Sequence, residues 1–284
     1  MPRPLWVLLR RISYYFQRLG HWVLVLRELR GDGMGEALKL YLSALAAPVT
    51  ALSGLDEWRY PKLLFDTCVR VGGSDRFRCR RATDDIWHIL PSGQGAVRRA
   101  LAQHLKPGGV FVDAGANIGG FTVFGARLVG SDGHVVAIEM MPDTARRLRE
   151  HLEVNGLGWV QVVEMALSDV GGQEVIAKMP PGLTGQASIV RADSTTDELV
   201  EIRVKTTTLD DVVGDLLRLD VLKVDLEGAE ALAFDGGREA LSRTQCVIFE
   251  DWGGSDHGRA AAERVTSAGF KLRRLDGLNM IGVR

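Results

Sequence analysis

The C-terminal two-thirds of the chain alternates short apolar runs with helical patterns, and this alternation limits the fold more than any other feature. The first run, VFVD (110–113), leads through a glycine-rich turn into a helical pattern over about 119–129. Four further apolar runs follow, at 133–140, 159–167, 220–226 and 245–251. Apolar runs that alternate with helices are typical of βαβ units, which build a parallel sheet with helices on both faces.

The end of the chain departs from this alternation. Residues 270–284 hold two strand patterns joined by Asp276-Gly277, a turn typical of a β-hairpin. We therefore predict an α/β fold with seven strands, in which a doubly wound parallel sheet carries one antiparallel strand. Residues 171–208 interrupt the rhythm with two strand patterns around a loop rich in Gly, Pro, Ser and Thr. We expect this insertion to shape a substrate site, because long insertions in compact folds are often functional.

The first third of the chain follows other patterns. Residues 34–52 have helical spacing that we expect Pro48 to interrupt, and 72–93 predict a hairpin or two edge strands. Residues 94–109 predict a helix that ends at Lys, Pro and Gly. We divide the chain into a helical, arginine-rich extension (1–70) and a main domain (71–284).

Residues 1–30 carry six arginines and one acid, Glu28, which gives this segment a charge of +5. Its apolar runs are five residues long, far short of the ~20 that span a bilayer, and no signal-peptide cleavage site follows them. An aromatic, arginine-rich amphipathic helix or helix pair remains. It can cap the main domain, form a dimer face or lie on an anionic membrane surface.

The composition removes other classes of function. A net charge of −1 gives no support for a nucleic-acid partner. The three cysteines are far apart and form no disulfide framework, as expected for a reducing compartment, so we expect a cytoplasmic protein, with the membrane periphery as the alternative. The six histidines lack zinc spacing, so we predict no metal ligands among them.

Acidic residues lie at or just beyond the ends of the five predicted strands that precede the terminal hairpin. In doubly wound sheets, ligands bind beyond the carboxyl ends of the strands, where strand order reverses. Any one of these acids can cap a helix, but five acidic strand ends together indicate a site. The ends are Asp113 in the first, Glu139 in the second, Ser168-Asp169 in the third, Asp225, Glu227 and Glu230 in the fourth, and Glu250-Asp251 in the fifth.

The glycine turn after the first strand is similar to a dinucleotide loop but lacks its key glycine. The G-x-G-x-x-G positions read Gly115, Asn117 and Gly120, so the middle glycine that lets the backbone approach a pyrophosphate is absent. Asp113 also puts a carboxylate where phosphates would lie, and like charges repel. The turn therefore disfavours a pyrophosphate cofactor.

S-adenosylmethionine fits these residues better, because it has no phosphate and carries a cationic ammonium and a sulfonium. Glu139 has the type and place to accept both ribose hydroxyls, although it would also suit NAD. Asp169, after Ser168, can accept a hydrogen bond from the adenine amino group, with Met140 or Met141 against the ring.

Five segments together resemble class I S-adenosylmethionine-dependent methyltransferases of the FkbM type. They are VFVDAGANIGGFT, VVAIEMMPD, ALSDVGG, TTLDD and VLKVDLEGAE, in that order, and the resemblance covers roughly residues 80–284. The family's glycine-loop pattern is matched at Asp113, Gly115, Asn117 and Gly119, its ribose-binding acid at Glu139, and its fourth-strand signature at Asp225, Glu227, Gly228 and Glu230.

The resemblance implies a Rossmann-like seven-stranded sheet with a reversed last strand. It also implies methyl transfer to a hydroxyl of a sugar, polyketide or other small molecule in natural-product biosynthesis. The alternatives are a nucleotide- or NAD-binding oxidoreductase and a non-catalytic ligand-binding module on the same fold. Titration with S-adenosylmethionine and with NAD separates these hypotheses.

Methyl transfer to a hydroxyl needs positioning and a base. Asp225 and Glu227 are two residues apart at a strand end, so both can project to one side of the sheet. One can serve as the base, or the pair can hold the acceptor's hydroxyls or, with Glu250, a divalent cation. His257 and His88 are second-choice bases.

We expect two segments to form the substrate walls. One is the loop 182–194, with Gln186 and Ser188, and the other is Thr83–Trp87, with Thr83 and Asp84. The partner we expect is a small molecule, with a homodimer and peripheral membrane contact through residues 1–30 left open.

Overall fold

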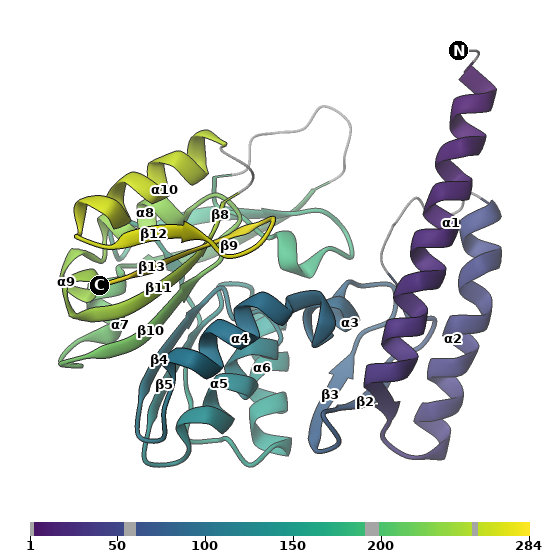
Figure 1. Ribbon diagram of the computed structural model, residues 1–284, viewed down its shortest axis with the longest axis horizontal. Coiled ribbons are helices and arrows are strands. Elements are labelled where there is room, and N and C mark those ends of the chain that lie inside the picture. Colours follow the sequence, from purple (N-terminus) through teal and green to yellow (C-terminus); the bar gives the residue numbers. More distant parts are fainter. Residues whose placement is uncertain (1–2, 54–60, 191–198, 252–254) are drawn as a thin grey trace. The chain divides into compact units, whose positions relative to one another are not determined.

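The computed structural model describes residues 3–53, 61–190, 199–251 and 255–284. These form two compact units, Met1–Gln94 and Gly95–Arg284 (Figure 1). The boundary between the units lies 24 residues beyond the sequence-based division at 70/71. The intervening segment holds a β-strand and two short helical turns, which belong to the first unit.

The first unit begins with two long helices, α1 (Arg3–Glu28) and α2 (Met34–Ser53). They pack against each other, and α1 buries Trp22 and Val25. The predicted N-terminal helix is therefore confirmed as a single helix. The predicted interruption at Pro48 is wrong, because α2 continues to Ser53. A proline removes one backbone donor, and the other turns of the helix keep their hydrogen bonds.

A small antiparallel sheet completes the first unit. Its strands β1 (Leu29–Gly31), β2 (Thr67–Val71) and β3 (Asp75–Cys79) lie in the order β1-β2-β3. The predicted hairpin exists but begins earlier than expected, at Thr67. The rest of the predicted segment is helical and holds α3 (Asp85–His88) and a 3₁₀ turn, η1 (Ser92–Gln94).

The second unit is built on a seven-stranded sheet in the order β12-β13-β11-β10-β4-β5-β6. The last strand, β13, is antiparallel to both its neighbours, and the pairs from β11 to β6 are parallel. The predicted sheet with a reversed last strand is thus confirmed. The bounds are β4 (Val110–Ala114), β5 (His134–Ile138), β6 (Gln161–Val163), β10 (Leu219–Val224), β11 (Thr244–Glu250), β12 (Lys271–Arg274) and β13 (Asn279–Val283).

Strand order reverses between β4 and β10. The chain moves outward from β4 to β6 and then returns to the other side of β4 at β10. In open α/β sheets, the carboxyl ends of the strands flanking such a reversal form the ligand-binding crevice. The first and fourth predicted strand ends, at Asp113 and Asp225, therefore meet at the point where a ligand is expected.

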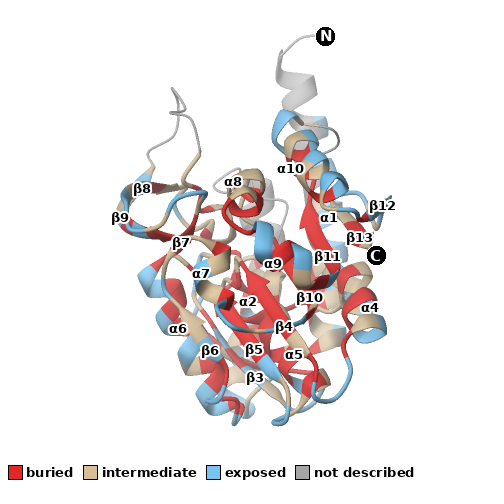
Figure 2. Ribbon diagram, turned by 90° about the vertical axis from the view of Figure 1, so that its left-hand side faces the viewer, coloured by how far each residue is buried: buried red, intermediate tan, exposed pale blue. Residues whose placement is uncertain are grey.

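Alternate residues of the central strands face opposite helical layers, as the pleat requires. Val112 belongs to a core shared with Leu222, Phe249 and Phe234 of α8. Its neighbour Phe111 faces α5, where a Cβ on Gly125 would lie 2.4 Å from the Phe111 ring. The strands β4, β10 and β11 are buried along most of their length (Figure 2).

Seven helices in the described part of the second unit accompany the sheet: α4 (Gly95–His104), α5 (Gly120–Val129), α6 (Pro142–Val154), α7 (Leu209–Val213), α8 (Glu230–Asp235), α9 (Arg238–Arg243) and α10 (Asp256–Ser267). Helix α7 ends at Val213, before Gly214, and α8 and α9 are separated by Gly236-Gly237. A Cβ on Gly236 would lie 2.2 Å from the Ser168 carbonyl oxygen, so the backbones meet closely there.

The insertion forms a second sheet in the order β7-β9-β8, with β7 (Ala166–Leu167), β8 (Glu174–Met179) and β9 (Val200–Thr207). Its two predicted strands are confirmed as β8 and β9. The third strand predicted over 159–167 is wrong in extent, because β6 ends at Val163 and the apolar run continues into β7, which pairs with β9. Periodicity shows that residues are buried in a strand but does not show which strand they pair with.

Candidate active site

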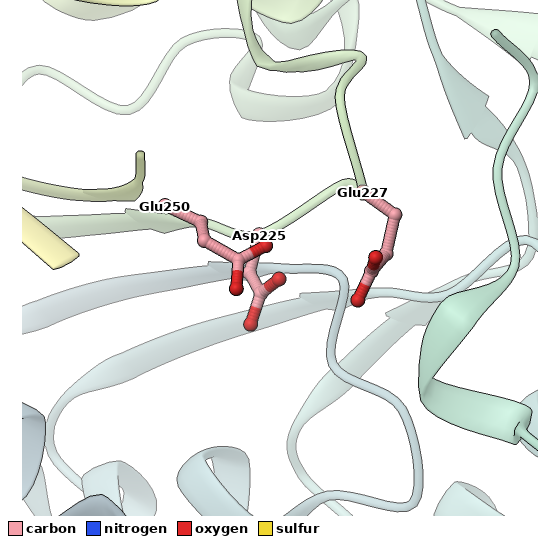
Figure 3. Close-up of side chains that lie close together, drawn as sticks. All are labelled: Asp225, Glu227 and Glu250. Atoms are coloured by element: carbon pink, nitrogen blue, oxygen red, sulfur yellow. The ribbon is translucent and has the colours of Figure 1, made fainter. Parts of the chain in front are cut away.

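Three carboxylates converge at the ends of two adjacent strands. Asp225 and Glu227 follow β10, and Glu250 is the last residue of β11 (Figure 3). One carboxylate oxygen from each lies within 4.8 Å of the others. Glu250 is buried, whereas the other two are partly exposed. The predicted grouping of these acids is therefore present. Such a cluster can accept a proton, hold hydroxyl groups or bind a cation.

A strained turn presents Glu227 to this cluster. Glu227 has φ 52° and Gly228 φ 102°, both in the left-handed region. Glu230 fixes the turn, because its carboxylate accepts hydrogen bonds from the Leu226 amide at 2.8 Å and the Gly228 amide at 3.3 Å. Burial raises the pKa of Glu230, and the backbone hydrogen bond from Leu226 opposes that shift. Glu230 thus fixes the backbone turn that carries Glu227.

The glycine turn after β4 lies against the same strand end. A Cβ on Gly115 would be 1.8 Å from the carbonyl oxygen of Asp225, so only glycine allows this approach. Gly119 has φ +93°, and its Cβ would lie 2.6 Å from Leu148 Cδ1. These contacts place the turn directly beside the carboxylate cluster.

Asp113 is fully buried inside the sheet. Its carboxylate accepts a hydrogen bond from the Thr122 hydroxyl at 2.7 Å and lies 3.4 Å from Lys223 Nζ. The same ammonium lies 3.3 Å from Asp225. Burial alone would lower the pKa of Lys223, but the carboxylates of Asp225 and Asp113 outweigh it and the net shift is upward. Lys223 therefore stays charged and links the two strand ends.

Glu139, at the end of β5, is buried beside the turn. Its carboxylate accepts hydrogen bonds from the backbone N–H of Asn117 at 2.9 Å and the backbone N–H of Met141 at 2.8 Å. A carboxylate offers about four lone-pair sites, so these two contacts do not exhaust it. Glu139 can hold the turn and accept ribose hydroxyls as well.

Asn117 has an orphaned amide group. The side-chain Nδ2 and Oδ1 are both buried and have no hydrogen-bond partner among the described residues, and the residue has φ 49°. A buried polar group without a partner costs roughly 1–3 kcal/mol. A bound ligand with one donor and one acceptor would remove that cost, so the turn fits a polar cofactor.

The residues predicted to contact adenine lie on two segments. Met140 packs against a small core built by Met141 and the insertion strands β8 and β9. Ser168 donates a hydrogen bond to Asp169 at 3.0 Å, and Asp169 is exposed. Both residues follow β7 and not the third strand of the main sheet, so the residues directly beyond that strand are Glu164 and Met165. The adenine role of Asp169 remains a prediction.

The insertion reaches the carboxylate cluster. The buried Ser188 hydroxyl donates a hydrogen bond to the Glu227 carbonyl at 2.8 Å. A Cβ on Gly228 would meet Val190 at 3.3 Å and the His257 ring at 3.7 Å. The structure thus brings Ser188 and His257 to the Glu227 turn. Gln186 lies in the 3₁₀ turn Thr184–Gln186 of the same segment, and residues 191–194 of the predicted wall lie outside the described residues.

Three predicted residues belong to the first unit. The buried Asp84 lies 3.1 Å from His88 Nε2, and Thr83 donates a hydrogen bond to the Arg80 carbonyl at 3.1 Å. These contacts stabilise the turn around α3. Substrate contact for Thr83 and Asp84, and a base role for His88, remain predictions.

Lys223 and Thr122 are the residues that sequence reasoning missed. Lys223 is a lysine in the middle of an apolar strand pattern, VLKVDL, and that position was the available signal. A lysine inside a buried strand needs a carboxylate partner, and Asp225, two residues along the chain, was a candidate. Thr122 gave no signal, because its bond to Asp113 depends on the path of α5.

The sheet order, the reversal between β4 and β10, and the acids beside a glycine turn are those of a doubly wound α/β fold, a class that binds ligands at the carboxyl ends of its strands. A model of the FkbM methyltransferase domain matches residues 113–272, more than half of the chain. The chain belongs to this family and is a methyltransferase.

Curated relatives are also methyltransferases. The chain is 29% identical over 179 residues to hexuronic acid methyltransferase AglP of Haloferax volcanii, and the match covers 62% of this chain and 70% of that protein. It is 28% identical over 193 residues to methyltransferase sdnD of Sordaria araneosa, covering 57% of this chain and 74% of that protein.

Solved structures with similar chains include two methyltransferases. The crystal structure of a putative rRNA methylase from Clostridium thermocellum has 14% identity and a TM-score of 0.45, with 67% of this chain and 94% of that chain covered. An S-adenosylmethionine-dependent O-methyltransferase from Thermotoga maritima has 14% identity and a TM-score of 0.44, with 76% and 77% covered.

Proposed function

We propose that the protein transfers a methyl group from S-adenosylmethionine to a hydroxyl of a small molecule. The observation that carries this proposal is the convergence of Asp225, Glu227 and Glu250 beside the Gly115 turn. The turn offers a cofactor site without phosphate-binding features, and the carboxylates offer a base next to it. Family membership supplies the methyl-transfer chemistry.

Glu139 and Asn117 would hold the cofactor. The Glu139 carboxylate suits two ribose hydroxyls, and the orphaned Asn117 amide suits one donor and one acceptor. Met140 would lie against the adenine ring, with Ser168 and Asp169 near its amino group. Asp113 would act indirectly, through Thr122 and Lys223, because its carboxylate is inside the sheet.

The bound sulfonium supplies an electrophilic methyl group. In the reaction the acceptor oxygen forms a bond to the methyl carbon, the carbon–sulfur bond breaks, and its electron pair stays on sulfur. The hydroxyl proton must go to a base. We assign that role to Glu227, whose carboxylate is partly exposed beside those of Asp225 and Glu250. Asp225 and Glu250 would orient the acceptor's hydroxyls, and His257 is the second-choice base.

A carbohydrate is the first acceptor to test. The name of the relative AglP states that it acts on hexuronic acid, and clustered carboxylates commonly accept hydrogen bonds from vicinal hydroxyls. Ser188 and Gln186 of the insertion would border this acceptor. A polyketide or another hydroxylated metabolite is the alternative acceptor.

The decisive experiment uses cofactor with a labelled methyl group. Purified protein is incubated with hexuronic acids, neutral sugars and cell extracts, and mass spectrometry identifies which molecule gains the label and at which atom. Label on a hydroxyl oxygen supports the proposal. Label only on nitrogen, carbon or a carboxylate oxygen, or no cofactor binding, contradicts it.

Replacing the proposed base tests the mechanism. Glu227→Gln should lower kcat by about 10²- to 10⁴-fold, because an amide cannot take the proton, and should leave cofactor binding by calorimetry unchanged. The matched control is Glu153→Gln, an exposed position on α6, which should keep full activity. Wild-type kcat in Glu227→Gln would refute the assignment.

A divalent cation held by Asp225, Glu227 and Glu250 is the second route, because their oxygens lie close enough together. The cation would lower the pKa of the acceptor hydroxyl. Loss of activity on chelation, restored by Mg²⁺ alone, would favour this route over a direct carboxylate base.

Calorimetry that showed NAD binding and no response to S-adenosylmethionine would instead favour an oxidoreductase or a binding module.

A further inference from the structure

Helix α1 has an apolar stripe that its packing in the first unit does not use. The stripe consists of Leu9, Ile12, Phe16, Leu19 and Val23, which are 39–64% exposed. Their spacing of three, four, three and four residues places them on one side of the helix. The packed side of α1 is different: it carries Arg18, Trp22 and Val25, which are buried.

Exposed apolar side chains are concentrated in this helical pair. Ten of the nineteen exposed large hydrophobic residues in the described part of the chain lie on α1 and α2. Those on α2 are Met34, Leu38, Tyr41, Leu42 and Leu45. A concentration of exposed apolar side chains is typical of an interaction site.

The charge of α1 identifies the occupant. The first acidic residue of the chain is Glu28, so α1 carries five arginines before its first acid; Arg18 is buried on the packed side, and residues 1–30 as a whole have a charge of +5. Arg27 and Arg30 are exposed. A second copy of the chain would bring two such segments together, and their like charges would repel. An anionic lipid surface matches both the charge and the apolar stripe.

The distribution of arginines also sets the orientation. Arginines at 3, 10, 11, 18 and 27 occur along the whole helix, and no described helix is long and apolar enough to cross a membrane. A helix with this composition lies in the plane of the interface. We propose that α1 docks on the surface of an anionic membrane through the stripe from Leu9 to Val23.

The test is co-sedimentation of the full chain with vesicles. We expect binding to vesicles of phosphatidylcholine and phosphatidylglycerol (70:30), weak binding to pure phosphatidylcholine, and loss of affinity between 0.1 M and 0.5 M salt. Phe16→Gln with Val23→Gln should weaken binding at least tenfold without changing the net charge. The matched control is Leu217→Gln with Leu278→Gln, two exposed apolar positions of the second unit, which should bind like the wild type.

Arg27→Gln is an independent variant, because it removes charge and leaves the stripe intact. It should weaken binding about fivefold, as expected for one cation near an anionic surface. Thermal melting of each variant checks its fold. Three results would overturn the proposal: no binding of the full chain to anionic vesicles, equal binding by the stripe and control variants, or a dimer that Phe16→Gln with Val23→Gln dissociates while vesicles stay unbound.

Discussion

The two sides of the active site depend on different kinds of interaction. The glycine turn is held by close backbone packing, because Gly115 lies against the Asp225 carbonyl and leaves no space for a side chain. The carboxylate side is held by electrostatic attraction, because the buried ammonium of Lys223 lies beside Asp113 and Asp225. The glycine turn therefore depends on the absence of a side chain, whereas the buried carboxylates depend on a compensating positive charge.

Removing the buried cation should have the largest effect. Lys223→Met keeps most of the side-chain volume but leaves Asp113 as an uncompensated buried charge, which typically costs about 3–5 kcal/mol of unfolding free energy. Denaturant unfolding measures this loss. Arg146→Met is the control, because it breaks exposed ion pairs with Asp143 and Glu150 and should cost less than about 1 kcal/mol.

A second substitution sharpens this result. Adding Asp113→Asn to Lys223→Met removes the stranded charge, so the double variant should recover part of the lost stability. If Lys223→Met and Arg146→Met cost the same, the buried ion pair is not what stabilises the carboxylate side.

A side chain at Gly115 should disrupt the packing of the glycine turn against the Asp225 carbonyl. Gly115→Ala places a Cβ against the Asp225 carbonyl and adds strain at φ +78°, which together cost about 2–4 kcal/mol and displace the turn. Gly156→Ala is the matched control, because Gly156 has φ +67° with open space around it. Equal thermal shifts in the two variants would attribute the effect to backbone strain and not to the contact.

Asn117→Ala should weaken cofactor binding with little effect on folding. The side-chain amide has no hydrogen-bond partner among the described residues, so its removal costs the ligand-free protein little stability. Loss of one donor and one acceptor should reduce affinity for S-adenosylmethionine about tenfold, on the scale of 1–2 kcal/mol. Calorimetry checks this. Unchanged affinity would show that the orphaned amide faces no ligand.

Glu230→Gln should give the smallest effect, visible as a change in pH dependence. Burial raises the pKa of Glu230 in the folded state, so its contribution to stability is complete below its unfolded pKa of about 4.5 and decreases as pH rises through the higher folded value. Glutamine can still accept both amide hydrogen bonds. The variant should therefore lack this decrease and match or exceed the wild type at neutral pH by up to about 1 kcal/mol. A steeper loss than wild type in urea unfolding at pH 5–8 contradicts this.

The local chain pattern determined much of this protein. Apolar runs and glycine signals predicted the seven strands, the reversed last strand and the acidic ends of four strands, at Asp113, Glu139, Asp225 and Glu250, because burial and turn geometry depend on residues close in sequence. The family resemblance rested on the same motifs, including Asp113, Glu139 and Asp225.

The tertiary structure decided which groups meet. It placed Asp113 beside Lys223, moved the end of the third strand to Val163, and brought Ser188 of the insertion to the Glu227 carbonyl. It also gave α1 one packed face and one exposed stripe. These outcomes depend on strand pairing and side-chain packing between segments up to 110 residues apart, and local periodicity carries no information about such partners.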